Sequence, residues 1–342
     1  MTVFRKVLVA ALFVFPFLLV AGEAYAQDQS ASSAQTCSLS KLASYDIGIS
    51  SRGNLLIDVN IDGTMRKMIL DTDEGQSLVT GAVAKDLNVY AQTLSPKLIK
   101  RFVTMRGTYA TSYIVIPKVN IGTAVVKDVP ALLAMMPSYG LDGTDGVLGM
   151  DVLHNFDLEF DLGHGKLNVF SPDHCAGQGQ YWSRQAAIVP FGFDEENKFV
   201  FPMQLDGKEV KAGIAAEEGP LFMQGYVMKE TFGIDEKSPG VVLATSGPSG
   251  SKFFSYTFHS LSAGELTISN PKIAFASAKS STRCDGEKHL SWGFVTCEKP
   301  DLMITGDLLG RLRLYFAVKE KKVYITGFNA TLDDAPVQGS TQ

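Results

Sequence analysis

The chain has 342 residues, of which 45% are hydrophobic and 20% charged. These are values of an ordinary globular protein, and they argue against a disordered chain or a membrane protein with many spans. The formal net charge of −5 argues against a general nucleic-acid-binding protein, which needs a basic face. With 32 glycines and 14 prolines, the composition favours an architecture of strands and turns.

The first 26 residues are predicted to be a signal peptide. Arg5 and Lys6 precede an apolar run over residues 7–21, which is short for a membrane span. The sequence Ala24-Tyr25-Ala26 then supplies the pattern of small residues that a signal peptidase recognises. The mature chain would therefore begin at Gln27 and be periplasmic or secreted, with no membrane partner after cleavage. An uncleaved membrane anchor is the alternative.

Export makes the four cysteines candidates for disulfides, because an oxidising compartment favours them and none lies in a CxxC pattern. Three sets of pairings are possible. Pairing Cys284 with Cys297 would close a polar loop, and pairing Cys37 with Cys175 would tie the start of one half of the chain to its end. This set is the one that we expect.

The first half of the mature chain aligns with the second half, which indicates an internal duplication. Residues 54–87 align without a gap with residues 198–231, at an offset of 144. In both copies an Asp-Gly pair, beginning at Asp62 and at Asp206, separates two apolar runs. This pattern predicts a tight β-hairpin in each copy.

A second block of the duplication pairs residues 147–170 with residues 303–326, at an offset of 156. Each copy ends in two alternating runs separated by a turn, which predicts a β-hairpin with one buried face. The longer offset is explained by about a dozen extra residues in the second copy, which we assign to the loop between Cys284 and Cys297.

The duplication predicts two similar β lobes rather than a solenoid, which needs more repeats. The expected organisation is a signal peptide at 1–26, a flexible segment at 27–39, a first lobe at 40–172, a linker at 173–185, a second lobe at 186–330 and a tail at 331–342.

The order of motifs in the first copy resembles that of a known family. An apolar strand runs into Asp71-Thr72 and a polar turn, and a short helix is expected at residues 81–87. The segment 145–170, which begins DGVLGMDVL, follows about 75 residues later. This arrangement resembles the bacterial retropepsin-like and pepsin-like aspartic peptidases in their duplicated, two-lobed form. The resemblance implies an all-β fold of two related lobes of the aspartic-peptidase type.

The resemblance also implies a reaction, the hydrolysis of peptide bonds in a polypeptide substrate. Two aspartates, one from each lobe, share a proton, so that one activates a water while the other protonates the scissile carbonyl. In this sequence Asp71 is the candidate catalytic carboxylate and Thr72 supports its loop. The chemistry needs no cofactor, and the five histidines show no metal-ligand spacing.

Three departures from the family pattern weaken the peptidase interpretation. The second-lobe position that aligns with Asp71 is Ala215, the glycine expected after Asp71-Thr72 is Asp73, and Glu74 replaces a small residue. Loss of one carboxylate removes a participant in proton transfer, which contributes roughly 10²–10⁴-fold to the rate. We therefore predict a catalytically impaired protein that binds an extended polypeptide in the cleft between the lobes.

Two alternatives keep Asp71 catalytic, so that the chain would be an active aspartic endopeptidase. Two chains could form a homodimer with two copies of Asp71, or Glu217 could substitute for the missing partner in a modified dyad. A third interpretation is that Asp71 merely caps the turn after its strand, a common role for aspartate.

Two further hypotheses concern ligands. Tyr109 and Phe253 lie in loops where related peptidases place a flap, and they are candidates for contact with a peptide. If the lobes pack as the family implies, five carboxylates could share one cleft and bind a hard cation such as Ca²⁺, although solvated turns would satisfy them as well. These carboxylates belong to Asp71, Asp73, Glu74, Glu217 and Glu218.

Overall fold

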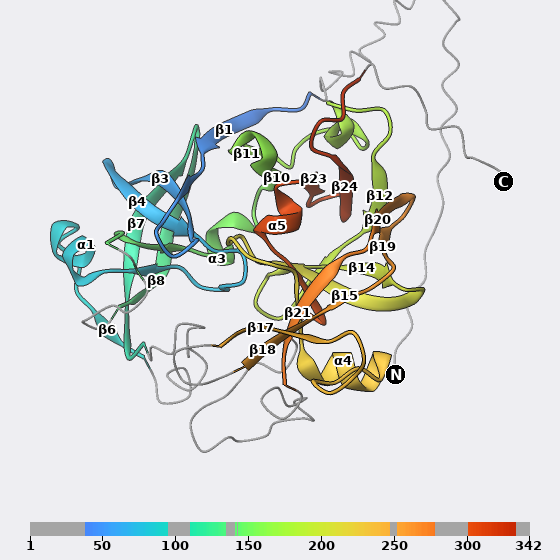
Figure 1. Ribbon diagram of the computed structural model, residues 1–342. Coiled ribbons are helices and arrows are strands. Elements are labelled where there is room, and N and C mark those ends of the chain that lie inside the picture. Colours follow the sequence, from blue (N-terminus) through green and yellow to red (C-terminus); the bar gives the residue numbers. More distant parts are fainter. Residues whose placement is uncertain are drawn as a thin grey trace, which may run out of the picture. The chain divides into compact units, whose positions relative to one another are not determined.

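The computed structural model describes residues 38–94, 110–134, 141, 143–246, 252–277 and 300–332 (Figure 1). The predicted signal peptide, Tyr109, Cys37, Cys284 and Cys297 lie outside the described residues. No helix within the described part of the chain is long and apolar enough to span a bilayer. The fold is all-β with two related lobes, as predicted, and its helices are short.

The first lobe is built on an eight-stranded sheet with the order β2-β3-β4-β9-β5-β8-β7-β6, whose long strands are blue to green in Figure 1. Two short helices, α1 (Gly81–Asp86) and α3 (Met150–Leu153), follow strands of this sheet. Its strands are β2 (Gly48–Ile49), β3 (Leu55–Ile61), β4 (Thr64–Leu70), β5 (Leu78–Val79), β6 (Gln92–Thr93), β7 (Ser112–Ile121), β8 (Ala124–Leu133) and β9 (Gly146–Leu148).

The second lobe repeats this plan in a ten-stranded sheet with the order β17-β18-β21-β16-β22-β15-β14-β19-β20, and β13 pairs with β14. The helices α4 (Gly225–Phe232) and α5 (Gly306–Leu309) correspond to α1 and α3. Its strands are β13 (Gly192–Phe193), β14 (Phe199–Leu205), β15 (Lys208–Ile214), β16 (Phe222–Met223), β17 (Val242–Ser246), β18 (Lys252–Thr257), β19 (Ser260–Ala263), β20 (Leu266–Ser269), β21 (Lys272–Ala276) and β22 (Leu302–Ile304).

The two predicted Asp-Gly hairpins are confirmed. Asp62 and Gly63 both have positive φ and connect β3 to β4, and Asp206 and Gly207 do the same between β14 and β15. Two consecutive residues of positive φ give the turn whose twist matches that of the flanking strands. Asp-Gly therefore fixes the register of the same hairpin in both lobes.

A third sheet of six strands is shared by the lobes, in the order β1-β11-β10-β23-β24-β12. The first lobe provides β10 and β11 and the second provides β23 and β24, and antiparallel pairing of β10 with β23 joins them. The strands are β1 (Lys41–Asp46), β10 (Asp157–Asp161), β11 (Lys166–Phe170), β12 (Ala187–Pro190), β23 (Leu312–Ala317) and β24 (Lys322–Gly327), with short 3-10 turns at Leu162–His164 and Gln178–Gln180.

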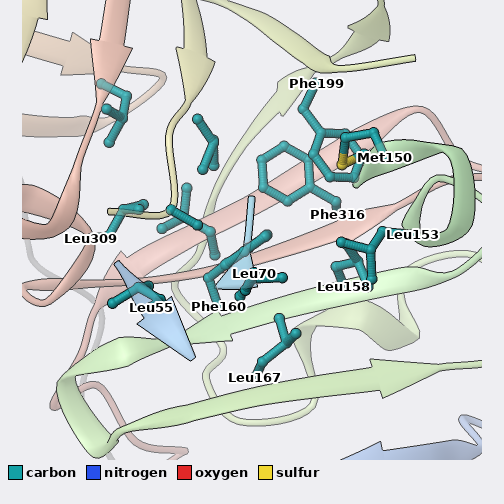
Figure 2. Close-up of a cluster of buried hydrophobic side chains, with 14 of the residues drawn as sticks. Leu55, Leu70, Met150, Leu153, Leu158, Phe160, Leu167, Phe199, Leu309 and Phe316 are labelled. Carbon is teal, nitrogen blue, oxygen red and sulfur yellow. The ribbon is translucent and has the colours of Figure 1, made fainter. Parts of the chain in front are cut away.

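One hydrophobic core runs beneath the shared sheet and includes residues of both lobes. Figure 2 shows Leu70, Leu158 and Phe160 of the first lobe close to Phe199 and Phe316 of the second. The rings of Phe199 and Phe316 are stacked with their centroids 4.2 Å apart. Because both lobes bury apolar surface in the same core, separating them would expose it at a cost of roughly 25 cal/mol per Å².

The prediction of one buried face for the hairpin β10–β11 is wrong, because every residue of β10 is buried. Segment 173–185 covers the other face of the sheet, where Tyr181 and Trp182 pack beside Phe170 and Tyr315. The buried Glu159 carboxylate accepts hydrogen bonds there from Arg313 Nε at 2.7 Å, Tyr181 Oη at 2.8 Å and Asn168 Nδ2 at 2.6 Å. Polar residues that looked solvent-facing thus form a buried, charge-paired layer.

His174 and Asp157 form a second buried pair in this layer. The side chain of His174 is 2% exposed, with Nε2 lying 2.6 Å from Asp157 Oδ2 and Nδ1 lying 2.8 Å from the carbonyl oxygen of Cys175. Both ring nitrogens therefore lie beside an oxygen acceptor, and the protonated ring can donate from each of them. Burial alone would lower the pKa of His174, but the hydrogen bonds to Cys175 and Asp157 raise it above its usual value.

The His174 pair predicts that stability declines as the pH rises above about 6.5. A raised histidine pKa in the folded state contributes stability that is present below about pH 6.5 and is lost as the pH rises through the folded-state pKa. Urea unfolding of wild type across this range is expected to show the decline, and His174→Gln is expected to flatten it. His259→Gln, at a side chain that is 92% exposed, is the matched control. A decline of equal slope in wild type and His174→Gln would contradict the assignment.

Candidate functional site

The candidate site lies where one loop of each lobe follows a buried strand. In the first lobe, β4 pairs in parallel with β9, with Leu70 opposite Leu148. The backbone N–H of Asp71 then donates to the carbonyl of Leu148 at 3.1 Å. Asp71 is therefore the first residue after the strand. The pairing of β4 with β9 fixes the position of its backbone.

The second lobe repeats this geometry with an alanine in place of the aspartate. β15 pairs in parallel with β22, with Ile214 opposite Ile304, and Ala215 N donates to the carbonyl of Ile304 at 3.0 Å. Ala215 is thus structurally equivalent to Asp71, as the alignment predicted. Its side chain is buried and has no group that can take up or release a proton.

Thr72 ties the two loops together. Its hydroxyl donates to the carbonyl of Ile214 at 2.8 Å and accepts from the N–H of Ala216 at 3.1 Å, and the residue is 1% exposed. One side chain of the first lobe thereby satisfies two backbone groups that flank Ala215. The equivalent of Thr72 is Ala216, which has no hydroxyl to return these bonds. The loop-supporting role expected for Thr72 agrees with this geometry.

The extra acidic residue Asp73 is directed to the other lobe. Its backbone N–H donates to Asp71 Oδ1 at 3.0 Å, while its carboxylate lies 3.5 Å from Nζ of Lys198. Lys198 is buried and was not identified from the sequence. The sequence signal for its burial is the short segment that places Lys198 close to the acidic residues Asp194 and Glu196. A buried cation needs several carboxylates around it, and this segment supplies two of them.

Glu217, the proposed substitute partner, corresponds to Asp73 rather than to Asp71. It is exposed, its backbone forms a bridge with Asn54, and its carbonyl accepts from Gly306 N at 2.7 Å. To act in place of a second aspartate, its carboxylate would have to reach back over two residues. The modified dyad stays a prediction.

The five-carboxylate cation site is not supported by the described residues, which contain no group of three or more acidic, His or Cys side chains placed to hold a metal ion. Asp73 faces the Lys198 ammonium instead, and Glu217 and Glu218 are both exposed.

Phe253, the described member of the predicted flap pair, lies in β18. It is partly buried, and its ring lies edge-on to Phe222 with the centroids 6.3 Å apart. Beside it, β17 is the edge strand of the described sheet and carries Val242 and Leu243 with more than half of each residue exposed. This apolar edge has no signal in the sequence, because a strand of five residues is too short for its hydrophobic period to be distinctive.

Of the four cysteines in the predicted disulfides, Cys175 lies within the described residues. Cys175 is not a free thiol. The other three cysteines lie outside the described residues, so both predicted pairings stay predictions.

Comparison with known proteins agrees with the geometry of the first lobe. Residues 57–152 match the aspartyl protease family, and this segment contains Asp71 and the β9–α3 segment. Basic 7S globulin from soybean matches with 11% identity and a TM-score of 0.45, covering 86% of this chain and 96% of that one. Conglutin gamma from lupine seeds matches with 9% identity and a TM-score of 0.45, covering 85% and 95%. No curated protein matches in sequence.

Proposed function

We propose that this chain is an aspartic-peptidase-like protein that is exported, is catalytically impaired and binds an extended polypeptide between its lobes. The observation that carries the proposal is the pair of equivalent positions Asp71 and Ala215, which Thr72 holds in register. Peptide hydrolysis by this family of folds needs two carboxylates that share a proton. This chain has Asp71 and, at the equivalent position, Ala215, so these two positions provide a single carboxylate.

Binding of a polypeptide, unlike its hydrolysis, needs no proton transfer to or from a carboxylate. An extended chain can add to a sheet edge through main-chain hydrogen bonds, while apolar surface beside the edge recognises alternate side chains. As the second-lobe side of the binding site we propose the edge strand β17, which has both features: Val242 and Leu243 are exposed, and Phe253 lies on the adjacent strand. A polypeptide is the ligand class that suits them.

Export is supported by the N-terminal sequence pattern and by Cys175, which is not a free thiol. A periplasmic or secreted location follows from these two features as part of the proposal.

An active enzyme is the second candidate, because the Asp71 loop keeps its backbone bond to Leu148 and, through the Thr72 hydroxyl, its bonds to the second lobe. A homodimeric site with two copies of Asp71 is disfavoured, since a second chain would have to displace the second lobe. Displacement would break the Thr72 bonds, the β10–β23 pairing and the common core. Glu217 as a substitute partner is the form of this candidate that leaves the fold intact.

Binding is tested with fluorescein-labelled casein, an unfolded polypeptide. The mature protein is expected to raise its fluorescence anisotropy in a saturable manner. Phe253→Ala is expected to weaken binding about tenfold, since an aromatic anchor contributes more than 1 kcal/mol. Met65→Ala is the matched control, because Met65 is 60% exposed and lies at the end of β4 remote from Asp71. No binding by wild type, or equal binding by Phe253→Ala, would contradict the proposal in this form.

A further inference from the structure

Lys198 is a buried cation at the junction of the two lobes. It directly precedes β14 and is 5% exposed, and its Nζ lies 2.8 Å from Glu196 Oε2, 3.5 Å from Asp73 Oδ1 and 3.7 Å from Asp194 Oδ2. Glu196 and Asp194 belong to its own loop, whereas Asp73 comes from the first lobe. Burial alone would lower the pKa of Lys198, but the carboxylates of Asp73, Glu196 and Asp194 raise it, so the ammonium stays charged.

The loop that carries Lys198 is stabilised by hydrogen bonds within the loop itself. Asp194 Oδ1 accepts from the backbone N–H groups of Glu196 and Lys198, both at 2.9 Å. The first-lobe loop approaches it so closely that a Cβ on Gly75 would lie 2.8 Å from the Cβ of Glu196. This contact and the Lys198–Asp73 ion pair hold the two loops against each other.

We propose that Lys198 is a positioning residue for Asp71, because it draws the carboxylate of Asp73 into the lobe interface and so leaves the Asp73 N–H directed at Asp71. The inference rests on the proposed function only in taking Asp71 as the carboxylate that meets the polypeptide.

The physical reason is the crowding of negative charge in one short turn. Asp71 and Asp73 are two residues apart, and like charges at that spacing repel each other. The Asp73 side chain is only 10% exposed, so without a cation it would pay a large desolvation penalty or turn outward into solvent. If the loop backbone moves to carry this carboxylate into solvent, the bond from the Asp73 N–H to Asp71 is lost.

The second lobe supplies an internal comparison. In the alignment Asn54 is the equivalent of Lys198, and Glu217 is the equivalent of Asp73. Asn54 and Glu217 form a backbone bridge with each other. Glu217 is exposed, so its carboxylate is not in a buried site that would require a buried cation. Of the two equivalent pairs, the lysine therefore occurs in the pair whose acidic side chain, that of Asp73, is largely buried.

Amide hydrogen exchange of the unliganded protein tests the proposal. In Lys198→Met the Asp73 amide is expected to exchange on the order of tenfold faster relative to the Asp71 amide, which is held by Leu148 and reports general destabilisation. The double variant Lys198→Met/Asp73→Asn is expected to restore protection to the residue 73 amide, since the charge to be expelled is gone. Lys198→Arg is expected to keep it.

Two outcomes would overturn the proposal: an unchanged ratio of the two exchange rates in Lys198→Met, which includes a uniform acceleration of both amides, or no rescue in the double variant. If Lys198→Met does not fold, Lys198→Gln replaces it, because its amide can donate to Glu196 but carries no charge. Glu217→Gln is the matched control and is expected to leave the Asp73 amide unchanged. No polypeptide is present, so the result is independent of casein binding.

Discussion

Ala215→Asp is expected to raise the rate of casein cleavage at least about 100-fold over wild type, since a missing general acid or base contributes roughly 10²–10⁴-fold. The reason is that the second loop already has the required backbone placement. Ala215 N bonds to Ile304 as Asp71 N bonds to Leu148, at 3.0 and 3.1 Å. Cleavage is measured by release of fluorescent peptides from labelled casein between about pH 3 and 7.

The control for this gain is the double variant Ala215→Asp/Asp71→Asn, which again has one ionisable carboxylate and is expected to be inactive. Ala215→Asn introduces a side chain of the same size as aspartate but without a titratable group, and it is also expected to be inactive. Activity in either variant, or none in Ala215→Asp with its fold intact, would show that the loops are not arranged as an incomplete dyad.

Thr72→Val is expected to lower the free energy of unfolding by about 3 kcal/mol, since it leaves two buried backbone groups unsatisfied at about 1–3 kcal/mol each. Valine replaces the hydroxyl with a methyl group of similar size. The carbonyl of Ile214 and the N–H of Ala216 then lose the hydroxyl that satisfies them between the lobes. Urea unfolding of the mature protein measures the effect.

Two substitutions control for this loss. Thr72→Ser keeps the hydroxyl and is expected to retain most of the stability. Thr64→Val, at an exposed threonine at the start of β4, is expected to change stability by less than about 0.5 kcal/mol. A Thr72→Val protein as stable as wild type would mean that the hydroxyl does not tie the lobes together.

Much of the lobe architecture could be predicted because local rules and the duplication agree. Asp62-Gly63 and Asp206-Gly207 specify the same turn wherever they stand between apolar runs, and the structure has both hairpins. The alignment also placed Ala215 at the equivalent of Asp71, since each follows a buried strand that pairs with a second buried strand. Backbone geometry is shared by duplicated segments even when the side chains differ.

The interface between the lobes could not be predicted in the same way. Glu159 and Asp157 alternate with apolar residues, a pattern that is typical of a strand with one solvated face. Their burial depends on Arg313 and His174, which are distant in sequence. The role of Lys198 likewise depends on a contact with Asp73 that no local pattern specifies.

The most direct test of the account is casein cleavage by wild-type mature protein from about pH 3 to 7, beside Asp71→Asn and Glu217→Gln. Because Ala215 cannot share a proton with Asp71, wild type is expected to release no more peptide than Asp71→Asn. Cleavage by wild type that is abolished by Asp71→Asn would contradict it and establish an aspartic peptidase. Additional loss in Glu217→Gln would identify Glu217 as the second carboxylate.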